Sequence, residues 1–257
     1  MKTTTAIIEI DKLHPTLEDG MFRLLDSYFD GVDRKRFEND LREKRWAVIL
    51  MDDDSKIHGF STLTILETVV DGRDVKAFYS GDTIIATGAR KMFSLEREWL
   101  PFVFARALAE PRRDWYWFLI SKGFRTFKYL PVYFKSFWPS PDADTPCGER
   151  KILDALASTK FGGDYDPRTG VVSISGDYAL KNAYSEIVES EKNKKFARFF
   201  AKKNPEWQCG AQLACLAKLT LDNLSPVARK LVDARRSAER GPGLTPGTFP
   251  TSSATPR

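Results

Sequence analysis

The chain has 257 residues, of which 42% are hydrophobic and 29% charged, and 40 Lys+Arg stand against 35 Asp+Glu. This composition supplies a core for one large domain or two small ones, and no apolar run approaches the ~20 residues of a membrane-spanning helix. Two histidines and three unpatterned cysteines argue against a His-rich metal site and a disulfide framework, so we expect no metal. No apolar segment follows Met1, and we therefore expect a cytoplasmic protein without a transmembrane segment.

Two helical patterns open the chain. Residues 16–29 place Met21, Leu24 and Leu25 at helical spacing, after a threonine and early acidic residues. Residues 33–44 are predicted to form a second helix, with Asp33 as its N-cap.

A three-stranded antiparallel meander is predicted next. The apolar run 46–51 indicates a buried strand, and the β-branched segment 57–70 indicates a second one. The dipeptide Asp71-Gly72 is a strong hairpin signal, after which 76–87 returns as the third strand.

The rest of the chain alternates helices and strands. Residues 89–109 form the longest helical pattern, which Pro101 is expected to kink or split. The aromatic run 115–121 is typical of a strand covered on both faces. Further elements are expected as helices at 131–138, 149–159 and 189–203, a strand at 170–175, and a strand or helix at 211–219.

These elements predict a mixed α/β (α+β) fold, in which helices flank a largely antiparallel sheet. The last stretch, 239–257, is dominated by Gly, Pro, Ser and Thr without a hydrophobic period. We therefore expect a single domain over 1–238 and a disordered tail over 239–257.

A carboxylate lies inside the apolar third strand. Asp82 follows Gly81 and precedes Ile84 and Ile85, and a glycine inside a strand often marks a bulge or a close approach of ligand. If the strand lines a cavity, Asp82 can act as a base; otherwise it binds a neighbouring backbone group or cation. Glu67, near the end of the preceding strand, is the competing base.

Polar residues also follow the aromatic strand. Ser121, Lys122 and Arg125 form a turn at the strand end, where α/β folds tend to collect ligands, so we expect an anion or acyl-donor contact there. Tyr129 and Tyr133 come next at a separation of four residues, in a segment where aromatic side chains also serve as packing.

The order of elements over roughly 16–138 resembles the GNAT superfamily of N-acyltransferases. The resemblance implies an acyl-CoA or acyl-carrier-protein thioester as co-substrate, with its pantetheine arm between the third meander strand and the aromatic strand. It also implies that the donor pyrophosphate sits at the start of the long helix. Here Gly88 allows close approach and Arg90 and Lys91 can pair with phosphates, although the family's second glycine is missing.

The same resemblance implies a division of roles. The strand-end residues Ile84, Ile85 and Ala86 would hold the donor and polarise its thioester. Asp82 or Glu67 would take a proton from a small-molecule amine. Tyr129 or Tyr133 would protonate the departing thiolate.

Two alternatives remain open. The missing glycine is consistent with an inactive GNAT-like domain that binds a ligand or a protein. The positive charge with many aromatic residues is consistent with RNA binding, but no basic–aromatic strand motif is present, so no nucleic-acid partner is expected.

Overall fold

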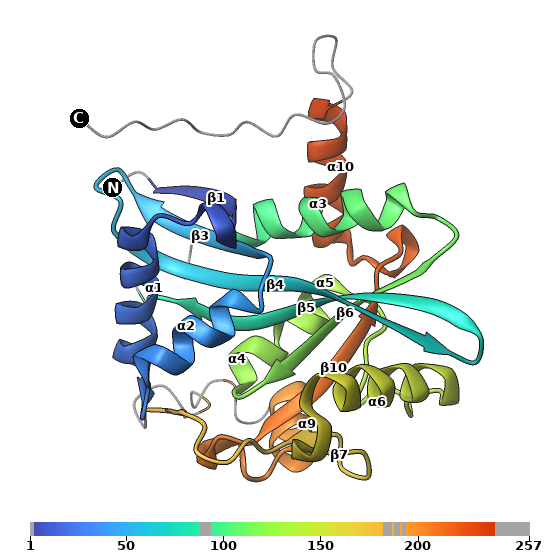
Figure 1. Ribbon diagram of the computed structural model, residues 1–257. Helices are drawn as coiled ribbons and strands as arrows, with labels where there is room; N and C mark the ends of the chain where they lie inside the picture. The colour runs from blue at the N-terminus through green and yellow to red at the C-terminus, as the bar shows by residue number, and fades with distance from the viewer. Residues whose placement is uncertain (1–2, 88–93, 182–186, 188–190, 192–193, 240–257) are drawn as a thin grey trace.

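The sheet that organises the molecule has eight strands in the order β1-β3-β4-β5-β6-β10-β8-β7 (Figure 1). The computed structural model describes residues 3–87, 94–181, 187, 191 and 194–239. All neighbouring strands of this sheet pair antiparallel except β5 and β6, which run parallel. The predicted mixed α/β class with a largely antiparallel sheet is confirmed.

The bounds of the elements are as follows. The strands are β1 (Thr3–Glu9), β2 (Phe29–Asp30), β3 (Trp46–Asp52), β4 (Ile57–Val70), β5 (Arg73–Ile85), β6 (Asp114–Ser121), β7 (Tyr165–Asp166), β8 (Val171–Val172), β9 (Ala179–Leu180) and β10 (Gln212–Lys218). The α-helices are α1 (Pro15–Tyr28), α2 (Arg34–Arg42), α3 (Ser94–Ala109), α4 (Phe124–Phe127), α5 (Tyr129–Tyr133), α6 (Cys147–Phe161), α9 (Lys195–Lys203) and α10 (Pro226–Glu239). Short 3-10 helices are η1 (Ile10–Lys12), η3 (Gly162–Asp164), η4 (Trp207–Cys209) and η5 (Leu221–Asn223).

The two faces of the sheet are covered by different helices (Figure 1). On one face α3, α5, α9 and α10 pack on a large cluster that includes Trp46, Phe78 and Trp117. On the other face α1 and α2 cover Ile49 and Phe60 near one end, and α6 covers the other end. Because both faces are buried, β3 and β6 are almost continuously apolar.

A β-bulge interrupts the ladder between β4 and β5. Ser61 pairs with Thr83, and Leu63 pairs with Ser80. An advance of two residues along β4 therefore corresponds to three residues along β5. Side chains alternate along a strand, and an extra residue reverses that alternation. Tyr79 and Asp82, at odd and even positions, consequently line the same pocket on the α2 face.

Most predicted elements are confirmed, with shifted ends. Asp33 does cap α2, since its side chain accepts a hydrogen bond from the Arg36 N–H at 2.7 Å. The described part of the long helix, α3, runs through Pro101 without splitting. The ambiguous segment 211–219 is a strand, β10.

Several predictions need correction. The helix expected at 131–138 ends at Tyr133, because the Trp138 backbone instead exchanges hydrogen bonds with Leu216 of β10. The strand expected at 170–175 is only β8. Of the helix expected at 189–203, Lys195–Lys203 forms α9 and Glu191 is helical, with a bend at Lys194 between them, while residues 189, 190, 192 and 193 lie outside the described part. Strand β1 and helix α10 were not predicted. Helix α10 reaches Glu239, and residues 240–257 lie outside the described part.

None of the described helices is both long and apolar enough to cross a membrane.

Candidate active site

The parallel strands β5 and β6 stop pairing before either of them ends. Their ladder runs from Val75↔Asp114 to Ser80↔Leu119. Beyond it β5 continues to Ile85 alongside β4, and β6 continues to Ser121. The bulge lies directly at this point. The two strands are therefore unpaired beyond Ser80 and Leu119, and this unpaired end of β5 and β6, the opening, is where the expected donor arm would lie.

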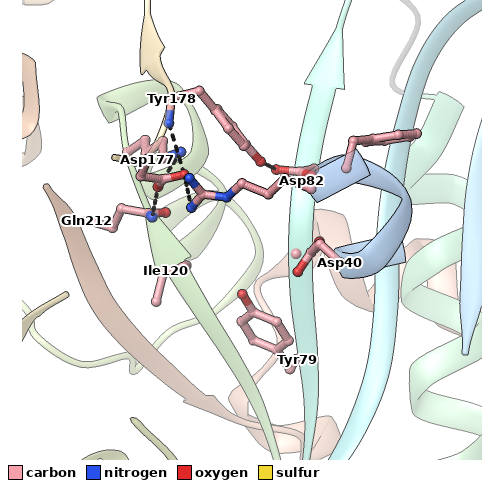
Figure 2. A pocket seen from close by; sticks show the side chains of 11 residues that line it. Asp40, Tyr79, Asp82, Ile120, Asp177, Tyr178 and Gln212 are labelled. Carbon is pink, nitrogen blue, oxygen red and sulfur yellow. Dashed lines mark hydrogen bonds and ion pairs between the residues drawn. The ribbon is translucent and has the colours of Figure 1, made fainter. Parts of the chain in front are cut away.

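A pocket of about 100 Å³ lies beside this opening on the α2 face (Figure 2). It is built by α2, the bulge of β5, the end of β6, the loop before β9, and β10. Its lining residues are Arg36, Phe37, Asp40, Tyr79, Gly81, Asp82, Ile120, Lys122, Asp177, Tyr178 and Gln212.

Asp82 is the central carboxylate of the pocket. The Tyr178 hydroxyl donates a hydrogen bond to its Oδ1, as Figure 2 shows. Burial, followed by the charge of Asp40, raises the pKa of Asp82, whereas the Tyr178 hydrogen bond and the charges of Lys122 and Lys44 oppose that rise. Asp82 is thus a carboxylate whose affinity for a proton is raised, and it is reachable from a cavity.

Tyr178 is held in place through its neighbour Asp177. The Asp177 carboxylate accepts bonds from Arg36 Nη2 at 2.9 Å and Gln212 Nε2 at 2.9 Å, and it pairs with Lys122 Nζ at 2.7 Å. The same ammonium lies 3.5 Å from the centroid of the Tyr178 ring. Strand β9, which follows directly, pairs with β2 at the end of α1. These contacts fix the tyrosine over Asp82.

A second hydroxyl and a second carboxylate complete the wall. The Tyr79 side chain points into the pocket from β5 (Figure 2). Burial and the charges of Asp40, Asp82 and Asp177 raise its pKa well above the ordinary value, so this phenol stays protonated. Asp40 itself accepts a hydrogen bond from the buried Lys44 at 2.6 Å.

On the opposite face of the sheet, α3 and α5 carry a separate group of polar residues. Tyr129 and Tyr133 stack nearly parallel, with centroids 5.9 Å apart at 11°. Ile85, Ala86 and Tyr129 pack against the same apolar cluster, which includes Tyr133. Glu96, in the first turn of α3, belongs to this group through a hydrogen bond with Tyr129.

The structure separates the two expected bases. Glu67 is 61% exposed and pairs with Lys76 at 3.3 Å. Lys76 precedes Asp82 by six residues on β5, which is roughly 20 Å along a strand. Glu67 therefore does not reach the opening that Asp82 faces.

The residues expected to hold the donor are dispersed. Ile84 faces α1 and α2, whereas Ile85 faces the α3 side. The Ala86 N–H donates to the His58 carbonyl at 2.8 Å, so it is already engaged and cannot polarise a thioester, contrary to expectation. Ile85 stays a candidate.

The residues after β6 are likewise spread out. The Ser121 hydroxyl donates to the Gly123 carbonyl at 2.9 Å and holds the turn. Lys122 pairs with Asp177 inside the pocket, which accounts for its charge without a phosphate. Arg125 is exposed on α4. The expected phosphate contacts Gly88, Arg90 and Lys91 lie outside the described residues.

Six polar residues of the pocket were not predicted from the sequence as site residues. They are Arg36, Asp40, Tyr79, Asp177, Tyr178 and Gln212. Tyr178 lies 96 residues from Asp82 in the chain, and no motif links the two. Tyr79 lies next to Gly81 and Asp82, a segment that the sequence did indicate as a candidate site, but the direction of the Tyr79 side chain depends on the bulge.

Within residues 3–87, 94–181, 187, 191 and 194–239, no group of three or more His, Cys, Asp or Glu side chains is placed to hold a metal ion.

No family model matches the chain, and no curated protein does. Solved structures similar to it include a GNAT-family N-acetyltransferase from Escherichia coli in complex with CoA, with 15% identity, covering 48% of this chain and 65% of that one, TM-score 0.33. Glucosamine-6-phosphate N-acetyltransferase from Arabidopsis thaliana has 16% identity, 45% and 81% coverage, and TM-score 0.34. A conserved protein of unknown function from Enterococcus faecalis has 15% identity, 52% and 33% coverage, and TM-score 0.39. The match thus spans a third of that last protein.

Each of these likenesses covers about half of this chain and has a TM-score below 0.5. The function must therefore be inferred from the geometry of this chain.

Proposed function

We propose that this chain is an acyl-CoA-dependent N-acyltransferase, which transfers an acyl group to the amine of a small molecule by direct attack. The observation that carries the proposal is the position of Asp82. A half-buried carboxylate with a raised pKa projects from a β-bulge, at the point where two parallel strands stop pairing.

On the acceptor side, the amine arrives as an ammonium ion and must lose a proton before it attacks. Asp82 accepts that proton, and its raised pKa brings it closer to that of a useful general base. Asp40 and the Tyr79 hydroxyl add a negative charge and a neutral dipole to the same pocket. Asp40 pairs with Lys44, and Asp177 pairs with Arg36 and Lys122. Asp82, which forms no ion pair within the described residues, is therefore the carboxylate left to receive the ammonium ion.

On the donor side, the acyl thioester lies in the opening between β5 and β6, near Ile85. The amine nitrogen forms a bond to the thioester carbon and loses its second proton to water, and the carbon–sulfur bond then breaks to release the thiolate of CoA. No covalent enzyme intermediate is needed. Most of the rate comes from holding the two reactants together and from polarising the carbonyl. Tyr129 or Tyr133, on the α3 face of the sheet, supplies the proton to the thiolate.

The proposal is tested by incubating the purified protein with acetyl-CoA and longer acyl-CoAs and a panel of primary amines. Released thiol and the mass of the acylated amine are measured. We expect turnover, and we expect Asp82→Asn to lower kcat by about 10²–10⁴-fold, the usual contribution of a general base. Affinity for acyl-CoA, measured by calorimetry, should be unchanged.

Asp74→Asn is the matched control, since Asp74 lies on the same strand with its side chain 60% exposed. It should keep full activity. Binding of acyl-CoA without turnover by any amine would favour the alternative of a binding module. Full activity of the Asp82→Asn variant would contradict the role of Asp82.

A further inference from the structure

An acidic side chain is buried on the α3 face of the sheet, and one of its carboxyl oxygens has no hydrogen-bond partner within the described residues. Glu96 is 7% exposed, and its Oε2 has no hydrogen-bond partner among the residues that the structure describes. Its carboxyl group is hydrogen-bonded with Tyr129. A buried carboxylate without full pairing is costly, because burial penalises the charged form.

A neighbour of Glu96 is likewise buried without a hydrogen-bond partner. Tyr133 is 1% exposed, and its hydroxyl also has no partner within the described part of the chain. Tyr129, by contrast, is only half-buried. It therefore connects the interior carboxyl group with the accessible side of the cluster.

The position of the group relates it to the opening between β5 and β6. Trp117 of β6 donates from Nε1 to the Ser80 hydroxyl of β5 at 2.8 Å, and Ser80 belongs to the last pair of the ladder. Trp99, one turn after Glu96 on α3, packs on Trp117 with centroids 4.6 Å apart. The group thus lies on the α3 face beside the opening, and Asp82 lies on the α2 face.

We propose that Glu96 is a protonated carboxylic acid that delivers its proton through Tyr129 to the departing thiolate. The inference rests on the proposed acyltransferase function. Tyr129 gives its hydroxyl proton to the sulfur and at once takes the Glu96 proton. The sulfur becomes a thiol, Tyr129 is restored, and Glu96 is left as a carboxylate that regains a proton from solvent. Glu96 is a positioning and proton-supplying residue, and Tyr129 is the group that touches the donor.

The electrostatics support this assignment. Burial raises the pKa of Glu96, and the hydrogen bonds of its carboxyl group with its own backbone N–H and with Tyr129 oppose the rise. Tyr133 of α5 also lies close enough to the Glu96 carboxyl group to interact with it electrostatically. A raised carboxyl pKa means that the proton is retained to higher pH and lost as the pH rises through that value. Burial raises the pKa of Tyr133 far above its usual value, so this hydroxyl gives up its proton with difficulty.

The experiment compares two acyl donors at saturating amine. Acetyl-CoA releases a basic alkyl thiolate, whereas the acetyl thioester of p-nitrothiophenol releases a thiolate that needs no proton. We expect Glu96→Gln and Tyr129→Phe each to slow acetyl-CoA turnover at least tenfold, in kcat rather than KM. Both variants should leave the aryl thioester rate within twofold of the original.

The control variant lies on the same helix as Glu96. Glu98→Gln changes an accessible acid two residues away on α3, and it should behave as the original protein with either donor. Tyr133→Phe, which removes the unpartnered hydroxyl, compares the two tyrosines, and it should slow acetyl-CoA turnover less than Tyr129→Phe does. The fall of kcat at high pH with acetyl-CoA should disappear in Glu96→Gln. Equal slowing of both donors by Glu96→Gln, or a Tyr133→Phe defect as large as that of Tyr129→Phe, would overturn the inference.

Infrared spectroscopy separates this inference from the proposed function. At pH 7 in D₂O the protein should show the band of a protonated carboxylic acid, absent in Glu96→Gln and retained in Asp82→Asn. If the band persists in Glu96→Gln, the inference fails whether or not the protein transfers acyl groups. If the band is lost but no amine is acylated, the proposed function fails instead.

Discussion

Replacing Gly81 by alanine should distort the bulge that presents Asp82. A Cβ at this position would lie 2.5 Å from Thr62 Oγ1 and 2.6 Å from Lys44 Cε, where ordinary contacts begin at 3.4 Å. A displacement of about 1 Å is therefore required. Lys44 cannot swing away easily, because its side chain is fully buried and its Nζ is bonded to Asp40.

The cost of such overpacking is about 1–3 kcal/mol. For a chain of this size that corresponds to a fall in Tm of roughly 2–12 °C, at about 2–4 °C per kcal/mol. Thermal unfolding followed by circular dichroism measures it. The same displacement moves Asp82 away from Tyr178, so acyl transfer should fall together with stability.

Gly148→Ala is the matched control for this prediction. Its added Cβ would meet nothing within 4 Å, and it lies in the first turn of α6. Its Tm should be unchanged or slightly raised. The double variant Gly81→Ala/Thr62→Ala should recover part of the lost stability, because the closest clash is removed. A Gly81→Ala protein as stable and active as the original would refute the steric reasoning.

Three further outcomes are expected. Trp117→Phe should cost about 0.5–1.5 kcal/mol more in urea unfolding than Trp115→Phe, since the Trp117 N–H donates to a β5 hydroxyl and the Trp115 N–H has no partner among the described residues. Asp40→Asn should shift the acidic limb of kcat/KM to lower pH, because the Asp40 charge raises the pKa of Asp82 and a lower pKa leaves the base ionised to lower pH; an unmoved limb would contradict this. Cys215 is buried with a raised thiol pKa, so a thiol reagent should modify only the two exposed cysteines of the native protein, as counted by mass spectrometry.

The sequence singled out the fold and, among the polar residues of the pocket, Asp82 and Lys122 but not the others. The signal for Asp82 was local, namely a charge next to a glycine inside an apolar strand. Asp177 and Tyr178 carried no such signal, because they lie in a loop whose neighbours are decided by the pairing of β9 with β2. Glu67 was as plausible a base as Asp82 until the strand register placed it beside Lys76.

Hydrophobic periodicity, turn residues and caps are local properties, and they sufficed to predict the meander, the helices around it and the mixed sheet. Strand β1 was missed because an edge strand needs no strong apolar pattern, and the segment 134–138 follows β10 because its backbone finds hydrogen-bond partners there. The site depends on features of another kind. A single bulge decides that Tyr79 and Asp82 share a face, and the burial of Glu96 and Asp82 decides their affinity for protons. Both follow from register and packing between distant segments, which only the tertiary structure determines.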